Sequence, residues 1–283
     1  MDPMLLPSLS DDEFDLIRRL IHERLGIHLT ANKRALVAGR LNFFLREKGY
    51  ANFHAYHEGI RNDTTGRELS ELADRITTNH TFFNRERAHF DYLSGTVLPQ
   101  LKEEKLRLGS RSFKIWCAAS STGEEPYMLA MLLMEFLGLD YRNWDAGILA
   151  TDISEKALGE ARLGIYTEEK ILNLPEPLRA RYFRKLPDDT YQAQSRLQQE
   201  VTFRRFNLIN PDFPFRSGFD VIFCRNVMIY FDVPTKEALV WKMHQFTNPG
   251  GYFFVGHSES MDRKSCPYQF VQPAVYRKEP AHA

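Results

Sequence analysis

Apolar residues in the first part of the chain recur at the three-to-four spacing of amphipathic helices. Ser10 followed by Glu13 matches a capping box, and the apolar stripe behind it stops at Gly26. A second stripe stops at Gly49, as expected of a glycine that ends a helix, and consists of Leu36, Val37, Leu41, Phe44 and Leu45. Further helices are expected at residues 30–48, 53–60 and 67–77. The pattern predicts a helical domain over residues 1–76.

The pattern changes near Thr77, where short and continuous apolar runs begin to alternate with helical stretches. Buried strands are expected at residues 112–119, 144–151, 219–224 and 251–256. Helices are expected between them at residues 126–137, 155–162 and 235–246. Such alternation predicts βαβ units and a mostly parallel sheet, so the fold class is α/β.

The remaining segments of the chain complete the domain plan. Residues 77–98 are expected to link the helical domain to an α/β domain over residues 99–283. Residues 268–276 are consistent with a final strand pair or edge strand. Residues 178–203 are more polar and alternating, which favours a small antiparallel β-subdomain inserted into the larger domain.

Composition narrows the class of protein. The 283 residues contain 37 basic and 37 acidic side chains, so no overall charge attracts nucleic acid. The chain shows neither a membrane-spanning apolar run nor a signal-peptide pattern, and we expect a cytoplasmic protein without direct membrane insertion. The three cysteines and nine histidines match no metal-site spacing, so no metal is expected.

One helix carries an unusual local charge. The face of the second helix opposite its apolar stripe is basic, and Glu47 is its one acidic residue. Its basic residues are Lys33, Arg34, Arg40, Arg46 and Lys48. The ordinary interpretation is a solvated surface, and the alternative is a docking site for an acidic partner.

The turn after the first predicted strand suggests the ligand. In open α/β sheets this turn approaches the ligand, and Gly123 permits a close approach of the backbone. The turn is neither GxGxxG nor a Walker A loop. Glu124 and Glu125 would repel a diphosphate but suit a cationic ammonium or sulfonium group. This favours S-adenosyl-L-methionine over NAD or ATP.

Asp152 follows the second predicted strand. A carboxylate at this position can accept both hydroxyls of a ribose. The alternative is that Asp152 caps the following helix, or shares that task with Ser154.

Several segments of the chain are similar to signature segments of a known family. They are TTNHTFFNR at residues 77–85, STGEEPY at residues 121–127, FCRNVMIYF at residues 223–231 and GHSE at residues 256–259. Together they resemble the CheR family of chemotaxis receptor methyltransferases, and the likeness extends over residues 12–277. The resemblance implies a helical N-terminal domain, a Rossmann-like methyltransferase domain and a small inserted β-subdomain.

The resemblance also implies the site. Carried over by position, the cofactor contacts are Asn79, Thr81, Arg85, Glu125, Asp152, Asn207, Leu208, Arg225 and Asn226. Arg85 and Tyr230 are the implied catalytic residues. From the sequence alone, Arg85 is more typical of a solvated side chain, Tyr230 of a core residue and Asn207 of a turn residue before Pro211.

The implied activity is the methylation of glutamate side chains on the cytoplasmic helical domains of chemoreceptors. S-adenosyl-L-methionine would be consumed and S-adenosyl-L-homocysteine released, by a protein expected to be a monomer. The receptor helices would dock on Lys33, Arg34, Arg40 and Arg46. Two alternatives are a methyltransferase for another substrate and a signalling adaptor that only binds the cofactor.

One loop departs from the pattern of family members that tether to a receptor's C-terminal pentapeptide. Such members have a longer, glycine-containing loop in the β-subdomain. The corresponding loop at residues 185–190 contains no glycine and is shorter. We therefore expect no pentapeptide tethering.

Overall fold

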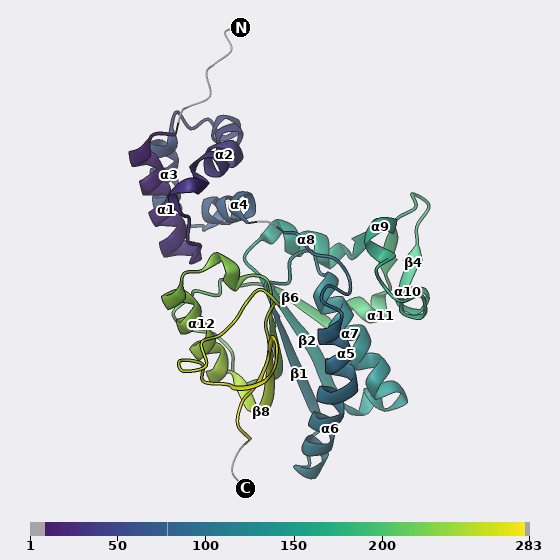
Figure 1. Ribbon diagram of the computed structural model, residues 1–283. Coiled ribbons are helices and arrows are strands. Elements are labelled where there is room, and N and C mark those ends of the chain that lie inside the picture. The colour runs from purple at the N-terminus through teal and green to yellow at the C-terminus, as the bar shows by residue number, and fades with distance from the viewer. Residues whose placement is uncertain (1–8, 78, 281–283) are drawn as a thin grey trace.

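The computed structural model describes residues 9–77 and 79–280, and its first part is helical (Figure 1). The helices are α1 (Asp11–Leu25), α2 (Arg34–Lys48), α3 (Phe53–Asn62) and α4 (Arg67–Ile76), with a 3-10 turn (Ala31–Lys33) before α2. The predicted capping box is confirmed, because Ser10 and Glu13 each accept the backbone N–H of the other. Gly26 ends α1 in the left-handed conformation at φ 72°.

The helical domain has a hydrophobic core of its own. One residue that was predicted to belong to the buried stripe of α2 lies outside this core. The buried face of α2 consists of Val37, Leu41, Phe44 and Leu45. Leu36 was expected in the same stripe, but it is 37% exposed. The bundle covers a narrower face of α2 than the apolar pattern indicated.

The second part of the chain begins with a nearly continuous helical run and ends in strands. The run consists of α5 (Ala88–Tyr92), a π-helical turn η2 (Leu93–Val97) and α6 (Leu98–Arg107). The main sheet contains β1 (Ser112–Ala118), β2 (Asp145–Asp152), β6 (Val201–Arg205), β7 (Phe219–Cys224), β8 (Thr247–Phe254), β9 (Gln269–Gln272) and β10 (Val275–Arg277). The other long helices of this part of the chain are α7 (Glu124–Leu137), α8 (Glu155–Leu163) and α12 (Val233–Gln245), and two short 3-10 turns are η3 (Gly138–Asn143) and η4 (Met228–Tyr230).

The order of the strands places the site. The sheet runs β6-β2-β1-β7-β8-β10-β9, and the strands from β6 to β8 are parallel, as predicted. The chain proceeds outward from β1 through β2 to β6, and β7 then returns to the other side of β1. The switch point therefore lies at the carboxyl ends of β1 and β7, where such sheets bind ligands. The predicted final strand pair is confirmed as the antiparallel β9 and β10.

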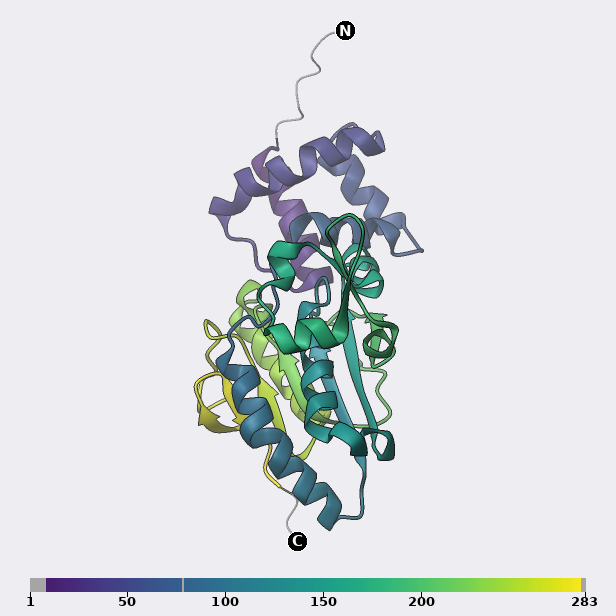
Figure 2. The same ribbon diagram turned by 90° about the vertical axis from the view of Figure 1, so that its right-hand side faces the viewer.

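Helices cover both faces of this sheet (Figures 1 and 2). One core cluster joins the sheet to α5, α6, α7 and α8, and a second joins the opposite face to α12. Every residue of β7 is buried, as expected for a central parallel strand covered on both sides. The helical domain lies over the carboxyl ends of the strands. None of the described helices combines the length and apolar character that a membrane span requires.

A second, smaller sheet projects from the domain. It has the order β3-β5-β4 and is antiparallel, with β3 (Ile165–Tyr166), β4 (Phe183–Lys185) and β5 (Tyr191–Ala193). The short helices α9 (Glu168–Ile171), α10 (Glu176–Tyr182) and α11 (Ser195–Gln198) accompany it. The insertion therefore begins before the predicted residue 178. It also ends before residue 203, because β6 belongs to the main sheet.

The segment given as a linker, residues 77–98, packs largely with the main sheet. Phe90, Leu93 and Val97 are buried in the core cluster of the sheet. Helix α5 and the π-helical turn thus pack as part of the α/β domain, and residues 79–87 are the non-helical part of this stretch.

Candidate active site

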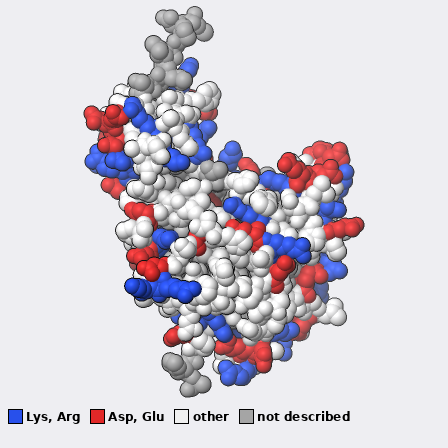
Figure 3. Space-filling model, viewed as in Figure 1, with Lys and Arg blue, Asp and Glu red and all other residues white. Residues whose placement is uncertain are grey.

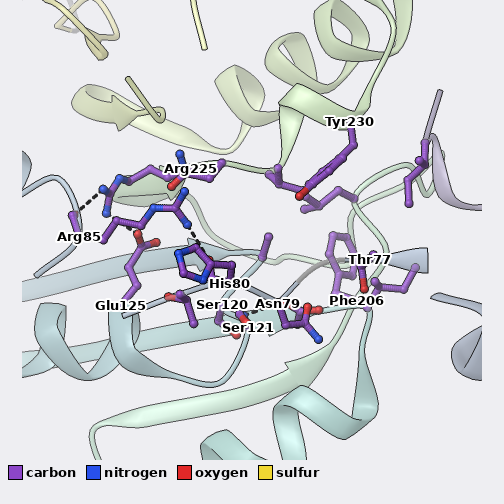
Figure 4. Close-up of a pocket in the computed structure, with 18 of the residues that line it drawn as sticks. Thr77, Asn79, His80, Arg85, Ser120, Ser121, Glu125, Phe206, Arg225 and Tyr230 are labelled. Carbon is purple, nitrogen blue, oxygen red and sulfur yellow. Dashed lines mark hydrogen bonds and ion pairs between the residues drawn. The ribbon is translucent and has the colours of Figure 1, made fainter. Parts of the chain in front are cut away.

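A cavity of about 1020 Å³, including its open mouth, lies at the switch point of the sheet (Figure 4). Its wall comes from the turns after β1, β2, β6 and β7, from residues 79–85 and from the end of α1. Every residue predicted for the cofactor or for catalysis lines it, namely Asn79, Thr81, Arg85, Glu125, Asp152, Asn207, Leu208, Arg225, Asn226 and Tyr230. The structure thus brings the whole predicted set together, and the roles of its members stay predictions.

The turn after β1 forms the floor of this cavity. Ala119 and Ser121 adopt left-handed conformations at φ 64° and 48°, which bends the backbone sharply. The Oγ atoms of Ser120 and Ser121 are buried, and neither finds a hydrogen-bond partner among the described residues. Since unpaired buried hydroxyls are costly, they are suited to bind the polar groups of a ligand.

Two residues of this turn have different roles from those expected. Gly123 was predicted to admit a ligand, but a Cβ atom here would lie 2.9 Å from both Ala161 Cβ and Tyr166 Oη. The glycine therefore allows α7 to pack against α8 and β3. Glu124 was predicted to face a cationic ligand. Instead it is fully buried and pairs with a lysine of the protein, because its Oε1 lies 2.6 Å from Lys170 Nζ. Glu125 is the one of the two glutamates that lines the cavity.

Asp152 supports the start of α8, as one of its two possible roles required, and its ribose role stays a prediction. Its Oδ2 accepts the N–H of Ser121 at 2.7 Å, and its Oδ1 accepts the N–H of Ser154 at 2.9 Å. Ser154 caps α8 through the N–H of Ala157. Burial raises the pKa of Asp152, and the backbone hydrogen bonds oppose this effect. Each carboxylate oxygen keeps a lone pair for a ligand hydroxyl.

Arg225 is clamped between two carboxylates. Its Nη1 lies 2.6 Å from Glu125 Oε2, and its Nη2 lies 2.9 Å from Glu86 Oε2. Nη2 also donates to the carbonyl oxygen of Arg85 at 2.6 Å. Burial disfavours the charge of Arg225, but the two glutamates raise its pKa. Both Nη atoms are thus committed to protein groups, which orients this wall of the cavity, whereas the buried Nε finds no partner among the described residues.

Glu86 is a part of the site that the sequence prediction missed. Burial alone would raise its pKa, but Arg225 lowers the pKa to about 2. Glu86 Oε1 also accepts from Asn226 Nδ2 at 3.1 Å, and Oε2 accepts from the N–H of His257 at 3.3 Å. Its position next to Arg85 in the matching segment was the one available signal.

The charges that line the cavity are balanced, which differs from the acidic cavity that the sequence indicated. Glu125 and Asp152 are negative, whereas Arg85 and Arg225 are positive. Arg85 is half-buried, its Nη1 donates to the carbonyl oxygen of His80 at 2.7 Å, and its guanidinium lies 5.9 Å from the Phe82 ring. Paired opposite charges fit the zwitterionic amino-acid part of S-adenosyl-L-methionine.

The helical domain contributes directly to the cavity. Leu25 and Ile27, at the end of α1, line it together with Tyr230 and Phe231. Ile27 forms an antiparallel bridge with Phe231, and the N–H of His28 donates to the carbonyl oxygen of Tyr230 at 2.7 Å. Tyr230 is half-buried. Its ring packs against the core of the helical domain and also lines the cavity.

Asn207 is a second point of contact between the domains. Its Nδ2 donates to the carbonyl oxygen of Arg24 at 2.7 Å, and its Oδ1 accepts the N–H of Ile209 at 3.2 Å. The turn role that its sequence context favoured is therefore present, while the residue also lines the cavity. Leu208 beside it is buried at 7% exposure.

Three potential metal ligands, Glu86, His89 and His257, lie next to this cavity with ligand atoms within 4.8 Å of one another. Burial, followed by the positive charge of Arg225, lowers the pKa of His89 to about 4. The guanidinium of Arg225 already neutralises Glu86. We therefore assign these side chains to the charge network around Arg225.

The four predicted docking residues divide into two pairs. Arg34 donates to the carbonyl oxygen of Leu9 and pairs with Asp11, and Arg40 donates to the carbonyl oxygen of Ile76 at the end of α4. Lys33 and Arg46 are exposed. Figure 3 shows basic and acidic side chains interspersed over the face that it draws, in keeping with the balanced composition.

Some other residues of the cavity wall carried no recognisable signal. Leu25 and Ile27 come from another domain, and Phe206 is an ordinary apolar position. Phe231 lies in the matching segment at residues 223–231, but it was not singled out. Ser120 and Ser121 could have been inferred, because small polar residues after the first strand are expected near a ligand.

The sequence of the whole chain is similar to that of known proteins. The family models for the CheR methyltransferase all-alpha domain and SAM binding domain match residues 12–77 and 79–276. The chemotaxis protein methyltransferase of Borreliella burgdorferi is 41% identical over 271 residues, which cover 96% of this chain and 95% of that protein. The chemotaxis protein methyltransferase of Escherichia coli is 36% identical over 273 residues, with 95% and 91% covered. The chain belongs to the CheR methyltransferase family.

Proposed function

We propose that this S-adenosyl-L-methionine-dependent methyltransferase esterifies glutamate side chains on the cytoplasmic helical domains of chemoreceptors. The observation that carries the proposal is a cavity with balanced charges that also borders Tyr230 and the helical domain. The names of the relatives, chemotaxis protein methyltransferases, support a receptor substrate.

Cofactor binding is proposed to rest on the residues carried over by position. Bound S-adenosyl-L-methionine supplies an electrophilic methyl group on a positively charged sulphur. Glu125 and Arg85 are suited to its ammonium and carboxylate groups, and Asp152 is suited to its ribose hydroxyls. Asn79, Thr81, Asn207, Leu208 and Asn226 complete the proposed contacts. Arg225 is proposed to act by holding Glu125 in place.

The protein's own contribution to the reaction is proposed to be alignment. A glutamate side chain has a pKa near 4.3 and is ionised at pH 7, so no general base is required. Tyr230 can donate a hydrogen bond to this carboxylate, and Arg85 can pair with it or with the cofactor's carboxylate. Holding the reacting atoms in line supplies about 7–11 kcal/mol in favourable cases.

The test is to incubate the protein with methyl-labelled S-adenosyl-L-methionine and purified cytoplasmic fragments of chemoreceptors. Base-labile label on glutamate, located by peptide mass mapping, is the expected result. Base-stable label would instead indicate N- or C-methylation of another substrate class. Cofactor binding without transfer to any receptor fragment or lysate protein would indicate a signalling adaptor and would contradict the proposal.

A further inference from the structure

A buried carboxylate outside the cavity wall holds the loop that carries Asn226 and Tyr230. Glu259 is 5% exposed and lies in the turn that follows β8. It does not line the cavity, whereas residues 225–227 and Tyr230 of the neighbouring loop do. Glu259 therefore has no direct access to a ligand in that cavity.

The contacts of Glu259 are all with backbone donors. Its Oε2 accepts the N–H groups of Gly256 at 2.5 Å and Asn226 at 2.8 Å. Its Oε1 accepts the N–H of Ile229 at 3.2 Å. One side chain thus ties the turn after β8 to both ends of the loop after β7. Hydrogen bonds to a charged acceptor are stronger than neutral ones, so this carboxylate is a firm anchor.

The loop turns sharply at Asn226, where the backbone takes an uncommon conformation. Asn226 adopts φ 58°, in the left-handed region that few residues other than glycine take, although asparagine takes it more readily than most. At Gly256, a Cβ atom would lie 2.4 Å from Asn226 Nδ2 and 2.9 Å from Glu259 Oε2. Strained conformations persist where the surrounding contacts determine them. Here Glu259 holds the backbone N–H of Asn226, while Glu86 holds its side-chain amide.

We propose that Glu259 is a positioning residue for methyl transfer, because it fixes the loop that presents Asn226 and Tyr230 to the cavity. The inference rests on the proposed function for its kinetic consequence. The structural part, that the loop is ordered by this carboxylate, does not depend on the identity of the substrate.

The substitution Glu259→Gln tests the proposal with almost no change in shape. An amide offers one acceptor oxygen, so its NH₂ group must face at least one of the backbone N–H donors. If the amide oxygen takes the Oε2 position, it still accepts the N–H groups of Gly256 and Asn226. The NH₂ group then faces the N–H of Ile229, next to Tyr230, and this hydrogen bond is lost. Glu259→Asp keeps the charge but withdraws the oxygens, and an intermediate effect is expected.

Asp262→Asn serves as the matched control, because Asp262 is exposed and its Oδ1 accepts a backbone N–H, that of Lys264, at 3.0 Å. For Glu259→Gln we expect kcat to fall by about 100-fold, as small misplacements of a reacting group can cause. The KM for the receptor fragment is expected to stay within about threefold, because the docking surface is untouched. The control is expected to retain the wild-type kcat.

Amide hydrogen exchange provides a readout that is independent of activity. Faster exchange confined to residues 226–230 of Glu259→Gln, with unchanged exchange in β1 and β7, is the expected result. Wild-type exchange in this loop together with wild-type kcat would overturn the proposal. A uniform rise in exchange would also overturn it, since that indicates general destabilisation.

The kinetic and structural outcomes separate the two proposals. If the wild-type protein fails to methylate receptor fragments but binds S-adenosyl-L-homocysteine, the proposed function fails. The positioning role is then supported if Glu259→Gln shows faster amide exchange confined to residues 226–230 and weaker binding of S-adenosyl-L-homocysteine. It is overturned if the exchange rates and the binding affinity both match those of the wild type.

Discussion

His89 shows how strongly single residues depend on their surroundings beside the cavity. Its ring is almost completely buried, and it packs against the rings of Phe254 and His257. Neither ring nitrogen has a hydrogen-bond partner among the described residues. Glu86 Oε2 lies 3.3 Å from Nδ1, but burial and the charge of Arg225 outweigh this attraction. The folded protein thus keeps His89 neutral.

This environment predicts a loss of stability in acid. The pKa of His89 is lowered to about 4 in the folded state, while the unfolded chain titrates near 6.5. Between these pH values the unfolded state binds the additional proton, so the His89 contribution is absent above pH 6.5 and grows unfavourable down to pH 4. In urea unfolding at pH 7 and pH 5, His89→Phe should lose less stability on acidification than the wild type. An exposed histidine, His54, gives the control His54→Phe, which should behave as the wild type does.

For single residues, the sequence indicated which residue types the site contains, but not which way each side chain points. Glu124 and Glu125 are adjacent and equally acidic, yet one faces Lys170 in the interior and the other faces the cavity. Which of two neighbouring side chains points toward a ligand depends on the start of α7 and on its packing against β3. Neither can be read from the local sequence, whereas the matching family segments located the cavity wall correctly.

Among the elements, the inserted β-subdomain braces the turn after β1. Tyr166 of β3 donates its hydroxyl to the carbonyl oxygen of Thr122 at 2.8 Å. Lys170 of α9 pairs with Glu124, which is fully buried, while the lysine side chain is 37% exposed. The insertion therefore supports the floor of the cavity from behind.

Removing this brace should weaken the protein. Lys170→Met leaves the Glu124 carboxylate buried without its partner, which costs about 1–3 kcal/mol of unfolding free energy. Urea denaturation followed by tryptophan fluorescence measures the loss. Lys185→Met is the matched control, because its pair with Asp189 is exposed to solvent and should contribute little to stability. Equal losses in the two variants would contradict the bracing role, and adding Glu124→Gln to Lys170→Met should restore part of the stability.

The loop between β4 and β5 bears on receptor tethering. Asp189 takes the left-handed conformation at φ 62° without a glycine, and the N–H of Leu186 bonds to the carbonyl oxygen of Thr190 at 2.8 Å. Asp188 also accepts the N–H and the hydroxyl of Thr190. We predict that this closed loop does not bind a receptor's C-terminal pentapeptide. Calorimetry should detect no binding, and an affinity in the micromolar range would show the prediction to be wrong.

The central strands β1, β7 and β8 were predictable because they are mostly buried and contain continuous apolar runs. The limits of the insertion were not. Its first strand, β3, has two residues and pairs with Tyr191 and Gln192, far along the chain. A strand this short has no periodicity of its own, so long-range pairing defines it.

Across the whole molecule, balanced charge leaves recognition to local surfaces. Lys33 and Arg46 are exposed on the helical domain, whereas Arg34 and Arg40 bond to that domain's own backbone. We infer that the first pair contributes more to docking of an acidic receptor helix, and that the second pair contributes more to folding.

This division predicts different phenotypes. Lys33→Glu and Arg46→Glu should each raise the KM for receptor fragments about fivefold, equivalent to roughly 1 kcal/mol, without changing the affinity for S-adenosyl-L-homocysteine. The wild-type KM should rise with salt, and the variants should depend on salt less. Arg107→Glu, at the exposed end of α6 away from the helical domain, is the control. An unchanged KM in both variants would exclude this surface from docking.

The roof that the helical domain places over the cavity limits how this enzyme can be recombined with its relatives. Leu25 and Ile27 line the cavity, and the backbone of Arg24 and His28 holds Asn207 and Tyr230. A chimera joined between residues 76 and 79 would therefore transplant part of the cavity wall along with the proposed docking surface. If α2 carries that surface, grafting its outer face while residues 22–29 stay native should change receptor preference and leave the cavity intact.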